Sequence, residues 1–148
     1  MGGHFYYYAV PYEQDISKAL QSLRTREFEA GRYNAVVPFL EFEMGASLKP
    51  APGKQHASIE EALEASEADG TRSILDIERI GDRPDFGVAV ALPATRLREL
   101  YGTDKPSREI AAQNMDFFED IERGHAIYFI LFRDDKPSEI FFAGISYD

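Results

Sequence analysis

The sequence of 148 residues contains no cysteine and no tryptophan. The absence of cysteine excludes disulfide frameworks, thiolate nucleophiles and thiolate metal ligands, and it favours a reducing, cytoplasmic environment. No apolar run approaches the roughly 18 residues that a membrane-spanning helix needs, and the first residues lack the basic start and apolar stretch of a signal peptide. We therefore expect a cytoplasmic protein with no membrane contact.

Basic residues are also scarce, because 16 Lys and Arg stand against 26 Asp and Glu, for a formal net charge of −10. Binding to nucleic acid requires a clustered basic surface, and the nearest approach here is two pairs, Arg24 with Arg26 and Arg96 with Arg98. The composition therefore predicts no binding of nucleic acid. The excess of acids is explained either by solubility alone or by a basic protein partner.

The short motifs of common catalytic and cofactor sites are missing as well. G-x-S-x-G, H-E-x-x-H and G-x-G-x-x-G do not occur, and the stretch around Gly53-Lys54-Gln55 lacks the first Gly and the Ser or Thr of a P-loop. His4, His56 and His125 stand far apart, without the spacing of metal ligands. The sequence therefore predicts no cofactor and no metal site.

What the sequence does contain is a bulky aromatic core, with 11 Phe and 8 Tyr, in a length that fits one domain over residues 1–148. A long irregular insert, residues 31–57, has only a weak strand signal at Leu40, Phe42 and Met44. Hydrophobic patterning and turn signals predict strands over residues 5–10, 73–80, 86–92, 126–132 and 139–147, and helices over residues 16–30, 58–69, 94–101 and 107–124. The stretch 73–80 is also compatible with one helical turn, but the turn signal GDRPD between it and the apolar run 86–92 favours a strand.

With the insert removed, the elements follow the βαββαβ order of ferredoxin-like folds, and one more strand follows. Residues 126–132, AIYFILF, are apolar at every position, which predicts a strand covered on both faces. The turn signal RDDKP after it predicts that the last strand returns as a hairpin. We therefore predict an α+β fold with a ferredoxin-like order, an inserted loop and helix, and an additional C-terminal strand.

The last predicted helix carries a group of acids just before the apolar strand. Asp116 and Asp120 are four residues apart with Glu119 nearby, a set that could bind a divalent cation. However, Glu119 and Arg123 are also four apart, in the order that favours a surface ion pair, and Arg123 lies where the helix dipole favours a cation. We therefore interpret these residues as a solvated helix face.

Two polar residues fall on apolar helix faces. Asn114 indicates either a hydrogen bond to the backbone of a neighbouring loop or a polar group in a pocket. Glu27 lies only about 20° from Ile16 at 100° per residue, so its carboxylate points to the core side of a regular helix. Either the last turn overhangs the core and Glu27 reaches solvent, or Glu27 is buried beside Arg24 or a Tyr hydroxyl, or it is a functional carboxylate.

Charged residues around the second helix suggest two further surfaces. Lys54 and His56 precede the helix start, where free N–H groups attract anions, although a flexible linker is the simpler interpretation. Glu64, Glu67 and Asp69 lie further along, and the last two oppose the helix dipole, so helix stability does not explain them. They predict a surface for a basic protein partner, with a solvated helix as the alternative.

The sequence therefore favours a small, acidic, non-enzymatic interaction or regulatory protein, such as an inhibitor, an immunity protein or a regulatory subunit. The alternative is a small-molecule-binding domain or a cofactor-free enzyme, whose predicted pocket residues are Tyr6, Tyr8, Glu27 and Asn114. A pocket reached by Glu27 and Asn114 would favour the second interpretation, and a filled core with an acidic surface the first.

Overall fold

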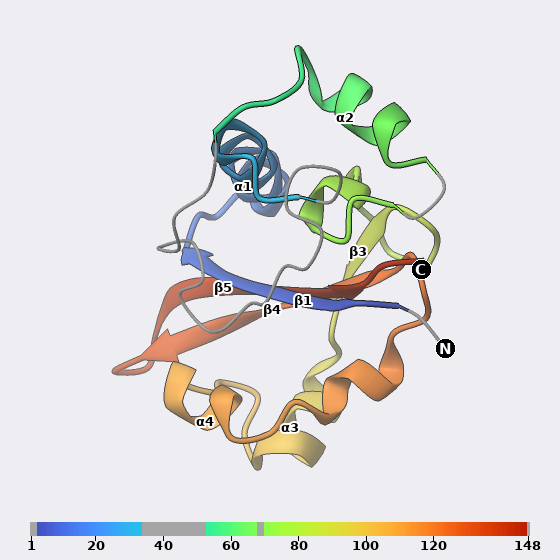
Figure 1. Cartoon of the computed structure of the whole chain (residues 1–148). Coiled ribbons are helices and arrows are strands. Elements are labelled where there is room, and N and C mark those ends of the chain that lie inside the picture. Colours follow the sequence, from blue (N-terminus) through green and yellow to red (C-terminus); the bar gives the residue numbers. More distant parts are fainter. Residues whose placement is uncertain (1–2, 34–52, 68–69, 148) are drawn as a thin grey trace.

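A five-stranded mixed sheet forms the centre of the computed structural model, which describes residues 3–33, 53–67 and 70–147 (Figure 1). In space the strands follow the order β1-β5-β4-β3-β2. β5 runs antiparallel to both β1 and β4, whereas β2, β3 and β4 run parallel to one another. The strand bounds are Phe5–Pro11 for β1, Arg79–Ile80 for β2, Val88–Ala91 for β3, Ala126–Arg133 for β4 and Lys136–Ile145 for β5.

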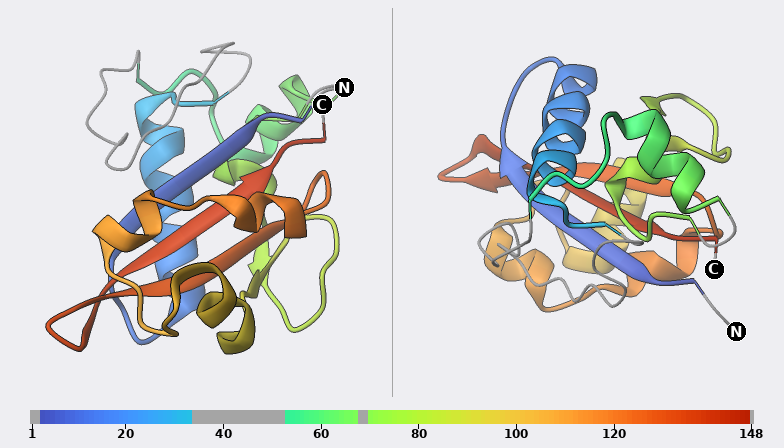
Figure 2. Two further views of the ribbon diagram at one scale, coloured as in Figure 1. Left: turned by 90° about the horizontal axis from the view of Figure 1, so that it is seen from below. Right: turned by 45° about the horizontal axis from the view of Figure 1, so that its top comes forward.

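Helices cover both faces of this sheet, which gives an α+β domain of three layers (Figures 1 and 2). The long helix α1 covers one face, and α3 and α4 lie across the other. The α-helices are α1 (Ile16–Ala30), α2 (Ile59–Ala65), α3 (Ala94–Tyr101) and α4 (Arg108–Ala112), and the 3-10 helices are η2 (Ile74–Asp76) and η3 (Asp116–Asp120). None of the helices in the described ranges has the length and apolarity needed to span a bilayer.

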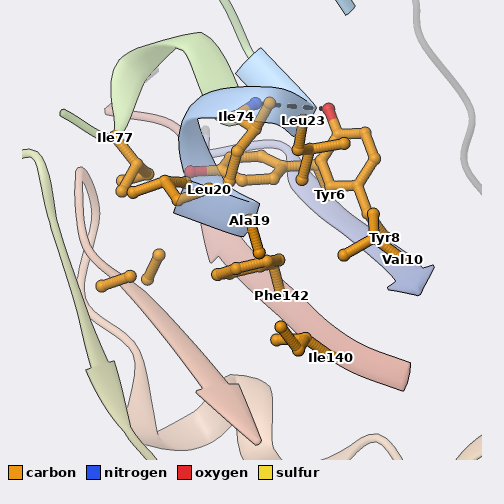
Figure 3. Packing of buried hydrophobic residues seen from close by; sticks show 12 residues of the cluster. Tyr6, Tyr8, Val10, Ala19, Leu20, Leu23, Ile74, Ile77, Ile140 and Phe142 are labelled. Carbon is orange, nitrogen blue, oxygen red and sulfur yellow. Dashed lines mark hydrogen bonds between the residues drawn. The ribbon is translucent and has the colours of Figure 1, made fainter. Parts of the chain in front are cut away.

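The core between α1 and the sheet is built by alternate residues of β1. Because side chains of a strand alternate between its faces, Tyr6, Tyr8 and Val10 all point towards α1 (Figure 3). They pack against the helix residues Leu20 and Leu23. The Tyr8 hydroxyl accepts a hydrogen bond from the Ile74 N–H at 3.2 Å, which ties η2 to β1 (Figure 3).

The core on the opposite face is mostly aromatic. Phe117 of η3 is fully buried, and its ring centroid lies 5.8 Å from that of Phe129 and 5.5 Å from that of Phe141. Phe129 and Phe141 come from the neighbouring strands β4 and β5 and lie 4.9 Å apart. Both faces of β4 are therefore covered, which confirms the prediction made from its uninterrupted apolar run.

Local signals explain the ends of the first helices. The Asp15 side chain accepts from the Lys18 N–H at 3.1 Å, and Gly31 ends α1 in the left-handed conformation, at a φ of 75°. Ser58 accepts from the Glu61 N–H at 3.2 Å, and the Glu61 carboxylate accepts in return from a backbone N–H just before Ser58, at residue 57. The predicted starts of both helices and the predicted end of α1 are confirmed.

The C-terminal hairpin also forms as predicted. Asp134 and Asp135 link β4 to β5 and have φ values of 52° and 60°, and Arg133 pairs with Lys136. Two consecutive residues at positive φ match the twist of a tight two-residue hairpin, and Asp tolerates this conformation better than most residues. The extra C-terminal strand is thus paired with β4 along most of its length.

The ferredoxin-like strand order is not confirmed. The elements succeed one another along the chain much as predicted, but β1 lies at the edge of the sheet rather than inside it. The physical reason is the C-terminal hairpin, because β5 occupies the position between β1 and β4 and pairs with both. What the structure shows is the coarser result, one α+β domain around a mixed five-stranded sheet.

Three predicted elements differ in the structure, and one of them is the helix predicted over 58–69, which ends at Ala65. In the predicted strand 73–80, the Ser73 side chain accepts from the Leu75 N–H at 3.2 Å and starts η2, so that a strand forms only at the two residues of β2. The predicted helix 107–124 is divided into α4 and η3, because the Asn114 side chain accepts from the Asp116 N–H at 2.8 Å and turns the chain.

The ends of the predicted insert 31–57 are joined, while residues 34–52, including Leu40, Phe42 and Met44, lie outside the described residues. The Gly53 N–H donates to the Ala30 carbonyl at 2.8 Å. The backbones approach so closely that a Cβ on Gly31 would lie 2.2 Å from the Gly53 carbonyl oxygen. Both ends of the insert are therefore fixed beside the last turn of α1.

Candidate functional site

A cleft of about 530 Å³ opens where β2 stops beside β3. Its walls come from both cores, because Leu92 and Ile127 belong to the α3 side of the sheet, whereas Ile80 and Tyr128 pack on the α1 side. This volume lies within the range of roughly 300–1,000 Å³ that is common for small-molecule sites. The cleft is therefore large enough to hold a compact organic molecule between apolar side chains.

The backbone of Ala91 faces this cleft. The Gly81 N–H donates to the Ala89 carbonyl at 3.0 Å, and among the described residues this is the last hydrogen bond between the β2 segment and β3. On the other side, the Leu92 N–H donates to the Tyr128 carbonyl of β4 at 2.9 Å. Because alternate residues of a parallel strand direct their N–H and C=O groups to opposite sides, both groups of Ala91 point away from β4 and into the cleft.

The polar rim of the cleft is predominantly acidic. Arg96 donates through Nε to Asp120 at 2.7 Å and through Nη1 to Glu99 at 3.2 Å, and its hydrogen bond with Asp120 raises the pKa of Arg96. Arg96 is thus bonded to two acids, of which Asp120 lines the cleft, and Asp82 lines it as well. Burial raises the pKa of Tyr128, and the nearby Asp82 raises it further, so the phenol keeps its proton near neutral pH.

The predicted pocket residues do not surround one cavity in the part of the chain that the structure describes. Tyr6 and Tyr8 are 0% and 3% exposed and point into the core beneath α1 (Figure 3). Asn114 lies on the other face of the sheet, where its Nδ2 donates to the Leu100 carbonyl at 3.2 Å. The bond to a neighbouring backbone, the simpler of the two interpretations of Asn114, is therefore present.

Glu27 is fully buried rather than exposed at an overhanging turn. Arg32 donates to both of its carboxylate oxygens, through Nε at 3.0 Å and Nη2 at 2.8 Å, and Arg26 donates at 3.1 Å. Arg24, the predicted partner, donates elsewhere. The reason is Gly31, which turns the chain back at the end of α1 and brings Arg32 beside Glu27. This carboxylate therefore forms a buried ion pair.

Asp76 is a buried carboxylate that the sequence analysis missed, and the signal was an acid inside the apolar run ILDI. Its Oδ1 accepts from the N–H and the hydroxyl of Thr71, both at 2.8 Å. Among the described residues, Oδ2 has no hydrogen-bond partner, and neither has the buried hydroxyl of Tyr6. Burial raises the pKa of Asp76, although the hydrogen bonds from Thr71 oppose this shift. Asp76 is not among the residues that line the cleft beside β3.

The raised pKa of Asp76 predicts a pH dependence of stability. From about pH 4 up to the raised pKa, the folded state binds more protons than the unfolded state, so stability falls as pH rises. Asp76→Asn removes this titration, and we expect a flatter dependence of the free energy of unfolding across that interval. Urea unfolding of wild type, Asp76→Asn and the exposed control Glu67→Gln between about pH 4 and 7 tests this. Equal slopes for wild type and Asp76→Asn would contradict it.

The predicted anion-site residues have different environments. Lys54 is exposed, whereas the His56 Nδ1 lies 2.5 Å from the hydroxyl of the buried Tyr33. His56 therefore helps to hold the end of the insert against the core. A role for these two residues in anion binding stays a prediction.

The structure describes two of the three acids that were predicted to form a partner surface. Glu64, on α2, and Glu67, just after it, are exposed, and Asp69 lies outside the described residues. Asp116 and Glu119 are exposed on η3, as a solvated face requires. Within residues 3–33, 53–67 and 70–147 no group of His, Asp or Glu is arranged to hold a metal ion. The basic protein partner stays a prediction.

The cleft residues were not recognised in the sequence as a site. The available signals were the turn GDRPD, which supplies Asp82 and Pro84, and Pro93 at the end of β3. Neither reveals that β2 is only two residues long. Comparison with protein-family models, curated proteins and solved structures found no match to this chain. A proposal about its function therefore depends on the geometry described above.

Proposed function

We propose that the protein binds a small, largely apolar molecule in the cleft beside β3. The observation that carries this proposal is the combination of apolar walls from both cores with the backbone N–H and C=O of Ala91, which face the cleft and have no hydrogen-bond partner there among the described residues. Small-molecule sites commonly pair a hydrophobic lining with a few fixed polar groups, and backbone groups of a sheet are held rigidly. The proposed activity is binding, and it requires no cofactor.

The length of the open strand edge favours a small molecule over an extended peptide. Ala89 is already bonded to Gly81, and Pro93 has no N–H, while its carbonyl accepts from Leu97 at 3.0 Å. The open edge of β3 is therefore one residue long, at Ala91. A peptide that adds a strand to a sheet forms hydrogen bonds with several alternate residues of the edge strand. Here only Ala91 of β3 is open, which is too few.

Binding of a neutral aromatic probe tests the proposal. Toluene has no hydrogen-bonding group, and we expect saturable ¹⁵N–¹H shifts at the backbone of β3 and of residues 80–82. Ala91→Phe places a ring in the cleft and should weaken binding at least about tenfold, which corresponds to roughly 1.4 kcal/mol. Ala94→Phe is the matched control on the exposed start of α3, and it should bind like wild type.

The distribution of the shifts decides the result. Shifts that are not saturable, or that spread over the surface and do not respond to Ala91→Phe, would contradict a specific site in this cleft. Circular dichroism of each variant establishes that the fold is retained before affinities are compared.

A further inference from the structure

We infer that the ligand of this cleft is a flat heterocycle of the nucleobase type, with an acceptor and a donor next to each other on one edge and with no phosphate. The inference rests on the proposed function and names the class of molecule that the same cleft selects. Three features of the site support it. They are the adjacent N–H and C=O groups of Ala91, the apolar side chains on both faces of the sheet, and the acidic residues at the rim.

The backbone of Ala91 presents one donor and one acceptor in the same direction. In a parallel strand the N–H and C=O of a residue point to the same side, and at Ala91 that side is the cleft. The complementary group is an acceptor beside a donor, as on the edge of adenine that carries a ring nitrogen and the N6 amino group. A molecule with only one of these groups would leave the other backbone group of Ala91 without a partner.

The walls of the cleft favour a flat molecule. A ligand bonded to the edge of β3 continues the plane of the sheet, and cleft residues stand on both sides of that plane. Leu92 and Ile127 come from the core on the α3 side, and Ile80 and Tyr128 from the α1 side. A planar ring places both of its faces against these side chains and its polar edge against Ala91.

The charges of the rim exclude a phosphate. Arg96 is the cation among the charged residues that line the cleft, and Asp120 and Glu99 already accept its hydrogen bonds. Asp82 also lines the cleft. A phosphate group would therefore find Arg96 already bonded to carboxylates and would approach the carboxylate of Asp82, and like charges at close range oppose binding. The cleft selects a free base or a nucleoside over a nucleotide.

Matched ligands test the edge contact directly. 9-Methyladenine carries the acceptor and donor pair, whereas 9-methylpurine has the same ring system without the amino donor. By NMR titration we expect 9-methyladenine to bind at least about tenfold more tightly, because 9-methylpurine leaves the Ala91 carbonyl unpaired. In the same titration adenosine should bind at least about tenfold more tightly than adenosine monophosphate.

A matched pair of proline variants tests the protein side. Ala91→Pro removes the N–H that points into the cleft and breaks no bond to β4, so the sheet keeps its ladder. Ala94→Pro places proline at the first position of α3, where it is well tolerated, and keeps the Ala91 N–H. We expect Ala91→Pro to weaken binding of 9-methyladenine at least about tenfold, and Ala94→Pro to leave binding of both 9-methyladenine and toluene unchanged.

The outcomes separate the two proposals. If toluene binds in the cleft but 9-methyladenine does not, or if 9-methyladenine and 9-methylpurine bind equally, the nucleobase inference is wrong and the proposed function stands. If neither toluene nor 9-methyladenine shifts the cleft residues, both proposals fail. Unchanged binding of 9-methyladenine to Ala91→Pro also overturns the inference.

Discussion

Replacing Glu27 with glutamine is expected to lower the free energy of unfolding by about 3 kcal/mol or more, the magnitude found when one partner of a buried ion pair is removed. Glu27 is 0% exposed, and three hydrogen bonds from Arg32 and Arg26 end on its carboxylate. Glutamine has the same shape, but it replaces one acceptor oxygen with a donor. Arg32, which is 9% exposed, then loses the negative charge of Glu27 that it faces in the wild type.

Glu29→Gln provides the matched control for this experiment, because Glu29 is an exposed acid on the same helix. Its effect should stay within about 0.5 kcal/mol, as for most surface substitutions. Urea unfolding of both variants measures the difference. The double variant Glu27→Gln with Arg32→Gln should be less destabilised than the sum of the single variants, since both lose the same interaction. An effect of Glu27→Gln as small as that of Glu29→Gln would show that the buried pair does not stabilise the fold.

Truncating Phe117 to alanine is expected to have a comparable effect, a loss of about 3–5 kcal/mol in the free energy of unfolding. Its ring is fully buried and packs edge-on against Phe129 and Phe141, so its removal leaves a cavity between η3 and the sheet. Phe117 also fixes the position of Asp120, three residues later on η3, which holds Arg96 at the cleft. Loss of the ring therefore removes both core packing and support for the rim.

Phe86→Ala is the control for this truncation, because the Phe86 side chain is 64% exposed. We expect it to cost less than about 1 kcal/mol, since its ring buries much less surface. Thermal and urea unfolding of the two variants give the comparison. If Phe117→Ala were no more destabilising than Phe86→Ala, the aromatic core beneath η3 would not be packed as described.

Elements governed by local chemistry could be predicted from the sequence. Asp15 and Gly31 mark the ends of α1, because a capping carboxylate and a glycine at positive φ act on their own neighbours in the chain. The hairpin of β4 and β5 follows from two apolar runs and the turn at Asp134 and Asp135. In each case the residues that decide the structure lie within a few positions of the element.

Elements decided by a single side chain were predicted less well. The apolar stripe over 107–124 has the period of one helix, but the Asn114 amide bonds to the backbone on both sides of it and interrupts the helix. Ser73 likewise turns the first part of a predicted strand into the three residues of η2. The hydrogen bonds of these side chains to the backbone compete with the regular hydrogen bonds of a helix or strand. The hydrophobic pattern does not show which kind of hydrogen bond forms.

The strand order and the candidate site depend on contacts between distant parts of the chain. The position of β5 between β1 and β4 is set by pairing of residues near 5 with residues near 145. The cleft exists because β2 ends beside Ala89, two residues before Ala91. Neither the pairing of β5 with β1 nor the early end of β2 is indicated by a sequence motif of fixed spacing. For the same reason the sequence did not decide whether Glu27 is buried, because its partner Arg32 follows the helix and is brought back by a turn.

The central claim, that the cleft beside β3 is a ligand site, is tested most directly by intermolecular NOEs between bound toluene and the methyl groups of the protein. We predict NOEs from toluene to the methyl groups of Ile80, Val90, Leu92 and Ile127, which line the cleft on both faces of the sheet. NOEs that instead map to methyl groups remote from β3, such as those of Leu23 and Met115, or no intermolecular NOEs at saturating toluene, would contradict the account.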